Sequence, residues 1–362
     1  MLTLKPIRGL HRQLAGFLAG AAAAFLILFL TGRWSLPPAP LLLAGLVSLP
    51  PVILIHELGH AVMAWIVGWR VAVIVVGPFW LRIAPLGLRL RREASVDGRT
   101  FNAPRHAGQH TRGRILALLA GGGLANLLSG GLAVWGARQL PPFGAAALAG
   151  FGLVSLFIGL SNLIPAQLKS GAANDGLRIL TTLLRPLPDA ALAAARATVL
   201  GQSMSGVAAK DWDAASMALL QARPDDEAGL SALMLFDYHN GFGRTGEARA
   251  ALDRAKARYG DAPAMRTPLI VIEAFFLARM EHDPDRAQAL LDTAPPRARK
   301  LYDYHRAQAA IPVARGDHGA ALAAIRAARR MLPRALPFIR ENEIALLDEM
   351  ARELDPPLAK AA

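Results

Sequence analysis

The sequence predicts a mainly α-helical protein in two parts: a membrane-embedded domain, residues 1–186, and a soluble α-helical repeat domain, residues 187–362. Three observations carry this prediction. The first half contains long apolar runs without charges, the excess of positive charge lies in that half, and the second half has the periodicity of soluble helices. Pro186 and Pro188 mark the expected boundary.

Four apolar stretches, in which Glu57 is the only acidic or basic residue, are long enough to cross a bilayer, which takes about 20 helical residues. We expect membrane spans at roughly 13–32, 40–67, 115–137 and 145–164. A signal peptide is the alternative for the first stretch. Its apolar run is too long for one and no clear small-residue cleavage site follows, so a span is favoured.

The net charge of +13 belongs to the first half, where 17 Lys/Arg stand against 4 Asp/Glu. Fifteen of these basic residues fall on one side of the expected spans, and only Arg33 and Arg138 fall on the other. The positive-inside rule then places the N-terminus, the 70–114 loop and the second half in the cytoplasm, which makes a multi-pass protein of the cell (inner) membrane. Because the basic half is also the apolar half, the charge indicates membrane orientation rather than nucleic-acid binding. The absence of cysteine excludes disulfides and thiolate metal sites.

Residues 71–92 predict a short β-hairpin in the cytoplasmic loop. The segment is β-branched at its start, alternates Leu and Arg at its end, and contains Gly77-Pro78 and Pro85 as breakers. Two roles remain open for it. A free strand edge can pair with an extended substrate, or the hairpin is an ordinary one whose arginines face lipid headgroups.

The pentamer His56-Glu57-Leu58-Gly59-His60 lies inside the second apolar run. On a helix, histidines four residues apart share one face, so both imidazoles can bind one zinc ion while Glu57 acts as general base. A chance match is the alternative, but ionisable side chains inside a span are costly and usually functional. The pentamer therefore predicts a zinc site with His56 and His60 as ligands.

A third ligand is expected, because catalytic zinc usually has three protein ligands and one open position. The first half holds only three other acids. Glu93 and Asp97 lie in a polar segment that includes a turn, whereas Asp175 directly follows the fourth span on the expected cytoplasmic side, as does the His60 end of the second. Asp175 is the favoured third ligand, with an ordinary Asp-Gly turn as the alternative.

A second histidine pair, His106 and His110, also shows four-residue spacing. The surrounding segment contains Gly and Pro, which disfavour a helix there. A second metal site is therefore the minor alternative to an ordinary loop.

Over about residues 40–185 the chain resembles the site-2 protease family of intramembrane zinc metalloproteases, on the pentamer and the later Asp-Gly. The resemblance implies that His56, His60 and Asp175 hold the zinc ion and that Glu57 activates water. It implies hydrolysis of a peptide bond in a membrane-spanning substrate.

Two asparagine motifs add to the resemblance. Asn162 and Pro165 of "SNLIP" match the family's Asn-x-x-Pro, and Gly122 and Asn126 of "AGGGLANLL" match a Gly-Pro-x-x-Asn motif on the intervening span. The resemblance makes Asn126 and Asn162 candidate catalytic residues near the substrate or the oxyanion. Gly123 replaces the usual proline, which weakens the second match.

The chain also departs from the family around the third ligand. Nine residues separate Pro165 from Asp175, more than in the common compact form, and Asn174 replaces the usual leucine before Asp-Gly. These departures concern the geometry of the loop and leave the ligand set unchanged.

The second half resembles a degenerate tetratricopeptide array. Alanines at positions 215, 251, 287 and 321 recur at 36, 36 and 34 residues, close to the 34-residue period of such repeats. Stacked helix pairs would offer a concave surface to a regulator or to the tail of a substrate. A plain helical bundle that caps the membrane domain is the alternative.

Together these features predict an intramembrane zinc metalloendopeptidase that cleaves a single-span membrane protein near the cytoplasmic face, in regulated proteolysis. Glu57 would take a proton from zinc-activated water and return it to the leaving amine. The alternative, from another class, is a catalytically silent membrane-anchored adaptor that binds partners through its helical repeats.

Overall fold

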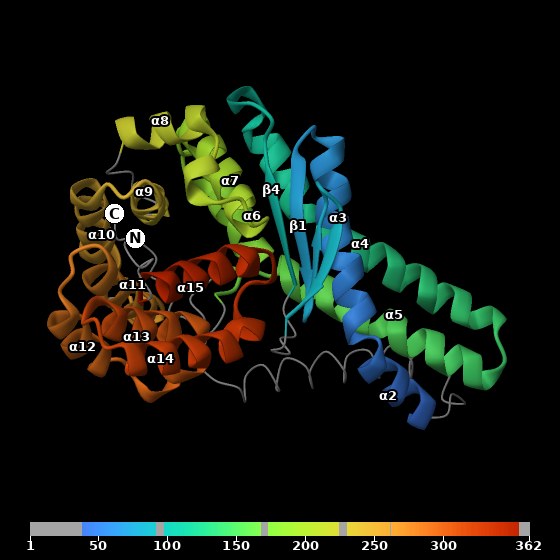
Figure 1. Ribbon diagram of the computed structural model, residues 1–362. Coiled ribbons are helices and arrows are strands. Elements are labelled where there is room, and N and C mark those ends of the chain that lie inside the picture. Colours follow the sequence, from blue (N-terminus) through green and yellow to red (C-terminus); the bar gives the residue numbers. More distant parts are fainter. Residues whose placement is uncertain (1–37, 92–97, 168–172, 224–229, 261, 355–362) are drawn as a thin grey trace, which may run out of the picture. The chain divides into compact units, whose positions relative to one another are not determined.

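The computed structural model describes residues 38–362 except 92–97, 168–172, 224–229, 261 and 355–362 (Figure 1). The described part is mainly α-helical, with 14 α-helices and one small four-stranded antiparallel sheet, as the sequence predicted. The chain divides into two compact units. The first unit is Met1–Gly77 with Ser95–Ala190, and the second is Pro78–Ala94 with Ala191–Ala362. The expected span at 13–32 lies outside the described residues.

Within the described residues, three helices of the first unit are long and apolar enough to cross a membrane. They are α3, α4 and α5, and they correspond to the second, third and fourth expected spans. The helices of this unit are α2 (Pro38–Val47), α3 (Leu49–Ile66), α4 (Arg112–Gly136), α5 (Pro142–Leu163) and α6 (Asp175–Leu184).

The expected single span at 40–67 is wrong in one respect, because the structure breaks it at Ser48 into α2 and α3. Pro50 and Pro51 stand in the first turn of α3. Proline has no N–H to donate, so it is tolerated at a helix start but interrupts a helix that continues through it. The Ser48 hydroxyl donates to the carbonyl of Gly45 at 2.8 Å and caps the end of α2.

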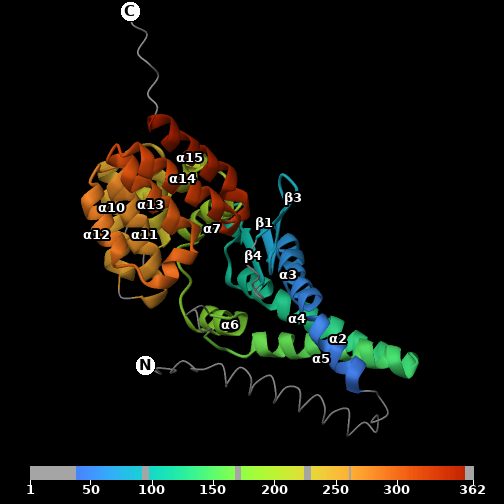
Figure 2. The same cartoon turned by 60° about the horizontal axis from the view of Figure 1, so that its bottom comes forward.

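Glycines let α3 and α4 approach until their backbones touch. A Cβ placed on Gly59 would lie 2.4 Å from the carbonyl oxygen of Gly121, and one placed on Gly121 would lie 2.6 Å from the carbonyl oxygen of Gly59. Helix α4 also packs along α5, and α2 packs on α5 (Figure 2). Small residues at helix crossings are typical of membrane bundles, where lipid is as apolar as leucine and close contact supplies the attraction.

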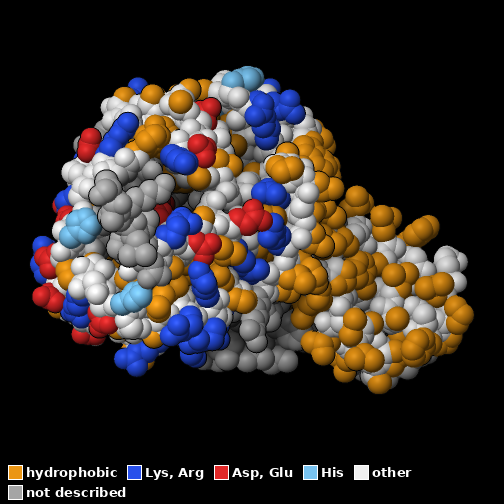
Figure 3. All heavy atoms as spheres, in the orientation of Figure 1, with side chains coloured by type: hydrophobic (Ala, Val, Ile, Leu, Met, Phe, Trp, Pro, Cys, Tyr) orange, Lys and Arg blue, Asp and Glu red, His pale blue; other side chains and the backbone are white. Residues whose placement is uncertain are grey.

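The outer faces of these helices are apolar. Figure 3 shows hydrophobic side chains covering the visible surface of α2, α4 and α5, with hardly any charged side chain among them. Exposed large apolar residues of this unit include Leu42, Leu46, Ile66, Leu128, Trp135 and Phe143. A surface of this kind is unfavourable in water and matches a lipid environment.

The region of the expected hairpin holds three strands rather than two, and a fourth strand follows it. Its order is β3-β2-β1-β4. β1 pairs antiparallel with β4, with Arg70 opposite Ala103 and Val76 opposite Gly98, and β2 pairs antiparallel with β3. The strands are β1 (Arg70–Val76), β2 (Phe79–Arg82), β3 (Gly87–Leu90) and β4 (Gly98–Ala103). The sequence had shown only a turn where β4 begins.

Strands β2 and β3 belong to the second unit, where arginines attach them to its helices. Arg82 donates to the carbonyl of Ser205 at 2.9 Å and lies over the ring of Phe338, 4.6 Å from its centroid. Arg89 pairs with Glu341 at 2.5 Å. The alternation of Leu and Arg in β3 therefore has one visible consequence: Arg89 contacts the helical part of its unit, while Leu88 and Leu90 are exposed.

The helices of the second unit form antiparallel pairs along the chain: α9 with α10, α11 with α12, and α13 with α14. Ala251, Ala287 and Ala321 lie in the second helix of each pair and are fully buried, whereas Ala215 on α8 is exposed. The helices are α7 (Ala190–Met204), α8 (Ala214–Ala222), α9 (Leu230–Gly241), α10 (Thr245–Tyr259), α11 (Pro263–Arg279), α12 (Pro284–Asp292), α13 (Tyr302–Ala314), α14 (His318–Met331) and α15 (Arg340–Leu354). Short 3-10 helices occur at Ala107–Gln109, Ala137–Gln139, Ala209–Asp211, Pro296–Lys300, Leu332–Arg334 and Pro337–Ile339.

Aspartates start three of these helices. Asp213, Asp283 and Asp317 each accept a backbone N–H three residues later, at the first turn of α8, α12 and α14. This N-cap bond satisfies a donor that the helix leaves unpaired, and it is worth about 1 kcal/mol. The caps explain why the helices begin where they do in a sequence otherwise rich in alanine.

Buried charges in the second unit are paired. Glu343 on α15 accepts from the Tyr302 hydroxyl and from Arg306, both on α13, each at 2.8 Å. Glu273 on α11 accepts from Arg249 at 3.2 Å and from Lys256 at 2.6 Å, both on α10. Each network joins two helices and removes the cost of burying an unpaired carboxylate.

Candidate metal centre

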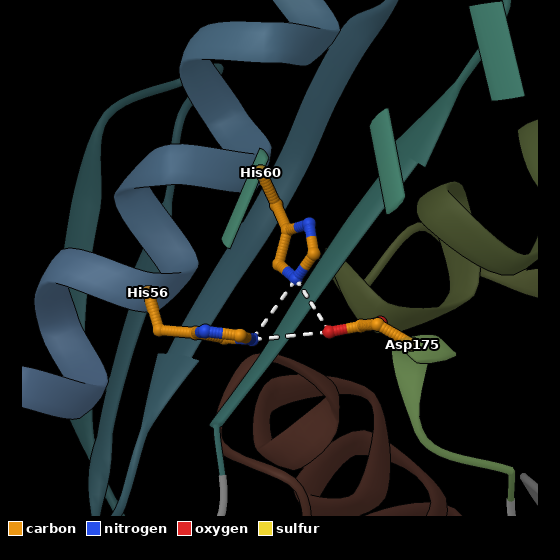
Figure 4. Close-up of side chains that lie close together, drawn as sticks. All are labelled: His56, His60 and Asp175. Carbon is orange, nitrogen blue, oxygen red and sulfur yellow. Dashed lines mark hydrogen bonds and ion pairs between the residues drawn. The ribbon is translucent and has the colours of Figure 1, made fainter. Parts of the chain in front are cut away.

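The two histidines of the pentamer lie on one face of α3, one turn apart. His56 and His60 are 6% and 8% exposed, and their imidazoles point away from the helix axis toward the same point (Figure 4). Their Nε2 atoms are 3.1 Å apart. The four-residue spacing produces this arrangement, because residues i and i+4 are neighbours on a helix surface.

Asp175 comes to the same point from the first residue of α6. The side chain of Asn174 caps this helix: its Oδ1 accepts from the N–H of Leu177 at 3.0 Å and from that of Ala166 at 2.9 Å. Its Nδ2 donates to the carbonyl of Ile164 at 2.7 Å. One amide therefore ties the start of α6 to the end of α5. Gly176 allows this contact, because a Cβ there would lie 2.2 Å from the carbonyl oxygen of Leu163.

The three side chains form a nearly equilateral triangle of ligand atoms. Oδ2 of Asp175 is 3.1 Å from Nε2 of His56 and 3.2 Å from Nε2 of His60. Within the described part of the chain, this is the one group of three or more histidine or carboxylate side chains whose ligand atoms all lie within 4.8 Å of one another. The group could hold a metal ion.

The donor set and its spacing fit a tetrahedral divalent cation. Two imidazole nitrogens and one carboxylate oxygen are the ligands of many catalytic zinc sites, where metal–ligand bonds of about 2.1 Å separate the ligand atoms by roughly 3.4 Å. The ligand atoms of the triangle are slightly closer together than this. Each pair would need to move apart by only about 0.2–0.3 Å to hold a zinc ion. Three ligands leave a fourth position for water or substrate.

Helix α4 supports the histidines from behind. Leu118, Gly122 and Asn126 are spaced four apart and line one stripe of the helix. The Nδ1 of His60 donates to the carbonyl of Leu118 at 2.8 Å. A Cβ on Gly122 would lie 2.5 Å from Nε2 of His60 and 2.7 Å from Nε2 of His56, so only glycine leaves room for the two imidazoles here.

Strand β4 supports Glu57. The Thr100 hydroxyl donates to Oε2 of Glu57 at 2.7 Å and lies 3.1 Å from its backbone carbonyl. A Cβ on Gly98 would lie 2.4 Å from Oε1, so the strand backbone packs directly on the carboxylate. Glu57 is 4% exposed and is held in one orientation from the sheet side.

The two asparagines lie on different sides of His56. Nδ2 of Asn126 is 3.3 Å from Nδ1 of His56, and Asn126 is fully buried. Nδ2 of Asn162 is 3.4 Å from Nε2 of His56, on the ligand side, and Asn162 is partly exposed. Of the two, Asn162 has the position expected for a group near a substrate, whereas Asn126 contacts the back of the ligand.

Among the described residues, the other histidines of the first half, His106 and His110, are not part of this group. Glu93 and Asp97 lie outside the described residues. His106 and His110 are not brought into a ligand cluster, and His110 instead stacks on Trp69 with ring centroids 6.0 Å apart. The second metal site considered from their spacing therefore gains nothing from the structure.

Sequence reasoning missed the supporting residues Thr100, Gly98, Leu118 and Ser155. Thr100 and Gly98 alternate on β4, a strand too polar to show the usual apolar alternation. Leu118 contacts Nδ1 of His60 through its backbone carbonyl, which no side-chain pattern can reveal. The one available signal was the glycine run 121–123, which indicated a close helix contact beside the site.

No model of a known protein family, no curated protein and no solved structure matches this chain.

Proposed function

We propose that the chain is an intramembrane zinc metalloendopeptidase, as the resemblance to site-2 proteases implies. The observation that carries the proposal is the triangle of His56, His60 and Asp175 on and beside a candidate membrane span, with a separately held glutamate next to the first histidine. A buried ion-binding group is costly inside an apolar helix bundle and is rarely kept there for stability alone.

Zinc is the metal we infer. A site with two imidazoles, one carboxylate and no thiolate, in a chain without cysteine, suits Zn²⁺ among the divalent cations. When bound, zinc would lower the pKa of a water molecule toward neutrality and polarise the scissile carbonyl.

Glu57 is assigned the proton transfers. Its carboxylate takes a proton from the attacking water, whose oxygen forms the new bond to the peptide carbon. The C–N bond then breaks, and Glu57 returns the proton to the departing nitrogen. Thr100 donates to one carboxylate oxygen, Oε2, and so orients the other for the water. We assign to Asn162, whose Nδ2 lies 3.4 Å from Nε2 of His56, the donation to the negatively charged oxygen that develops on the carbonyl.

We infer the orientation from the charge distribution, and the partners from the resemblance and from the helix pairs. The protein would lie in the cell (inner) membrane. By the positive-inside rule, its N-terminus and its second unit would face the cytoplasm. The substrate would be a single-span membrane protein, cut near the cytoplasmic face. Its helix must unwind locally, because an α-helix hides its carbonyls in hydrogen bonds. The helix pairs of the second unit would recruit a regulator or the cytoplasmic tail of the substrate.

The decisive experiment compares wild type with Glu57→Gln in detergent or vesicles, using tagged single-span reporter helices that contain Gly or Pro near their cytoplasmic end. We expect both proteins to bind about one zinc ion per chain and only wild type to cut a reporter. His60→Ala should lose both zinc and cleavage. Glu247→Gln, at an exposed position of the second unit, is the matched control and should cut normally.

Cleavage by Glu57→Gln at the wild-type rate would refute the assigned general base. A wild-type protein that binds zinc stoichiometrically but cuts none of the reporters would favour the membrane-anchored adaptor, with a structural metal site.

A further inference from the structure

Helix α4 determines which nitrogen of each histidine faces Asp175. The carbonyl of Leu118 can only accept a hydrogen bond, so Nδ1 of His60 carries the hydrogen in their 2.8 Å contact. A neutral imidazole with its hydrogen on Nδ1 has a free lone pair on Nε2. His60 is therefore oriented with its bare nitrogen toward His56 and Asp175, as a metal ligand must be.

The corresponding contact of His56 is made by a side chain, the amide of Asn126. As placed, Nδ2 of the amide faces Nδ1 of His56 at 3.3 Å, and Oδ1 faces the Ser155 hydroxyl at 3.5 Å. Turning an amide by 180° exchanges its oxygen and nitrogen with almost no change in shape, so the hydrogen-bond partners decide which orientation holds.

The serine network favours the turned amide. The shortest contacts in it join the Ser155 hydroxyl to the backbone carbonyl of Asn126 at 3.0 Å and to the Ser129 hydroxyl at 3.0 Å. A hydroxyl has one hydrogen. If Ser155 gives that hydrogen to the carbonyl and accepts from Ser129, it has none left for Oδ1, but it still has a lone pair for an N–H of the amide.

With the amide turned, every polar atom at this fully buried position has a partner. Nδ2 of Asn126 donates to Ser155, and Oδ1 accepts from Nδ1–H of His56. In the opposite orientation Oδ1 depends on the 3.5 Å contact from the Ser155 hydroxyl, whose single hydrogen has a nearer acceptor in the backbone carbonyl at 3.0 Å. When that hydrogen goes to the carbonyl, Oδ1 is left without a donor in a place that water does not reach, which costs about 1–3 kcal/mol.

We propose that Asn126, held by Ser155, is a positioning residue for the metal site: its amide oxygen accepts Nδ1–H of His56 and keeps Nε2 bare toward Asp175. This assignment rests on the metal-binding part of the proposed function. It gives Asn126 a different task from the substrate contact that the sequence resemblance implies. Both histidines then take their orientation from one stripe of α4, Leu118 through its backbone and Asn126 through its side chain.

The test uses full-length protein and measures the Zn²⁺ dissociation constant by competition with a chelator. Asn126→Leu keeps the size and removes the acceptor, and it should weaken zinc binding about 10- to 100-fold, the usual effect of losing such a partner. Asn126→Asp keeps an acceptor in place and should bind within about threefold of wild type. Ser155→Ala, which frees the amide to turn, should cause a smaller loss of about three- to tenfold on the same basis.

Co²⁺ absorption provides the second measurement, because its visible bands report ligand geometry. We expect Asn126→Asp to keep the wild-type spectrum and Asn126→Leu to change it. Ser161→Ala on the same helix as Ser155 is the control, since Ser161 is exposed and its hydroxyl, the group that the change removes, donates to the carbonyl of Ile158. Thermal unfolding identifies any variant that fails to fold. If the Asn126 variants fail to fold, the zinc affinity of Ser155→Ala alone tests the proposal.

Equal losses in Asn126→Leu and Asn126→Asp would overturn the inference, because they would mean that the amide donates to His56. Unchanged affinity in Asn126→Leu or in a folded Ser155→Ala would also overturn it. A wild-type chain that binds neither Zn²⁺ nor Co²⁺ would instead refute the metal site itself, so the two failures are distinguishable.

Discussion

Small residues bring helices together in both units, but glycine does this in the first and alanine in the second. Between α3 and α4, Gly59 and Gly121 place backbone against backbone. In the helix pairs of the second unit, Ala251, Ala287 and Ala321 are fully buried and their methyl groups fill the space between helices. In water each buried methyl group adds hydrophobic stabilisation. In lipid that gain is absent, and close approach is what remains.

The difference also explains what each unit does with its buried polar groups. At Gly122 the missing side chain makes room for two imidazoles, so the glycine serves the candidate site rather than the helix contact. In the second unit, Glu343 joins α13 to α15 through Tyr302 and Arg306. The buried polar groups beside Gly122 thus form the candidate site, whereas Glu343 joins two helices.

The strongest way to break this comparison is a set of glycine-to-alanine changes along α4. Gly122→Ala should weaken zinc binding by about 100-fold or more while leaving the protein folded, because its Cβ meets only the ends of two imidazoles, which can turn aside at the expense of the site. Zinc affinity and thermal unfolding are the measurements. Gly131→Ala is the control, since nothing lies within 4 Å of its Cβ.

Gly121→Ala should behave in the opposite way and lower the unfolding temperature, because its Cβ meets the backbone of Gly59 at 2.6 Å. If Gly122→Ala and Gly121→Ala lose stability equally and both keep zinc, the separation between site glycines and packing glycines is wrong.

The next largest effect is expected in the second unit. Glu343→Leu leaves Tyr302 and Arg306 without their shared acceptor, and removal of one partner from a buried charge pair costs about 3–5 kcal/mol. We expect a loss of about that size in the free energy of unfolding, measured by denaturant or thermal melts, with zinc affinity unchanged. Glu341→Leu is the control: Glu341 is an exposed partner of Arg89, and a surface pair contributes about 1 kcal/mol or less.

The smallest effect concerns pH. Part of the Asp237 side chain on α9 is accessible to solvent, but the surrounding protein desolvates its carboxyl and raises the pKa to about 6. Arg306 opposes the rise, and Asp303 and Glu343 add to it. The folded state therefore binds this proton more tightly than the unfolded state. Stability from this group is present below the unfolded pKa near 3.8 and is lost as pH rises through about 6.

Asp237→Asn should remove that dependence and stabilise the second unit at pH 7.5, by about 1 kcal/mol or less because water screens the exposed group. Melting temperatures at pH 4.5 and 7.5 measure the effect, and Asp292→Asn, an exposed aspartate bonded to Gln288, is the control. A variant less stable than wild type at pH 7.5 would contradict the assignment.

The sequence was a good guide where one physical requirement dominates. Long apolar runs predicted α3, α4 and α5, because the thickness of a bilayer sets the length of a helix that crosses it. The spacing of His56 and His60 predicted that their ring nitrogens meet, because helix geometry is fixed. That Asp175 joins them depended on a topological argument, and the structure brings it within 3.2 Å of both. The catalytic roles of Glu57 and Asn162 stay predictions.

The sequence was a poor guide where the structure of a segment depends on contacts with residues far away in the chain. Strand β4 is polar, and its identity comes from pairing with β1 and from Thr100 holding Glu57, neither of which leaves a local pattern. Two prolines inside an apolar run, Pro50 and Pro51, indicated the break at Ser48. The prediction of one span at 40–67 rested on hydrophobicity alone and ignored them. The position of Asn126 behind His56 depends on how closely α4 approaches α3. The spacing of the glycines indicates a close approach but does not give the distance.

The hydrogen bonds by which Asn174 joins α6 to α5 have a consequence for which changes in the sequence this region tolerates. Ala166 and Asn174 are bonded to each other through backbone and side chain, and Gln167 pairs with Ala173, so the two residues on each side of 168–172 are held together. Lengthening a loop that is already closed changes its entropy by well under 1 kcal/mol per residue. Insertions and deletions there should therefore be nearly neutral, with Asp175 held in place while the spacing from Pro165 drifts.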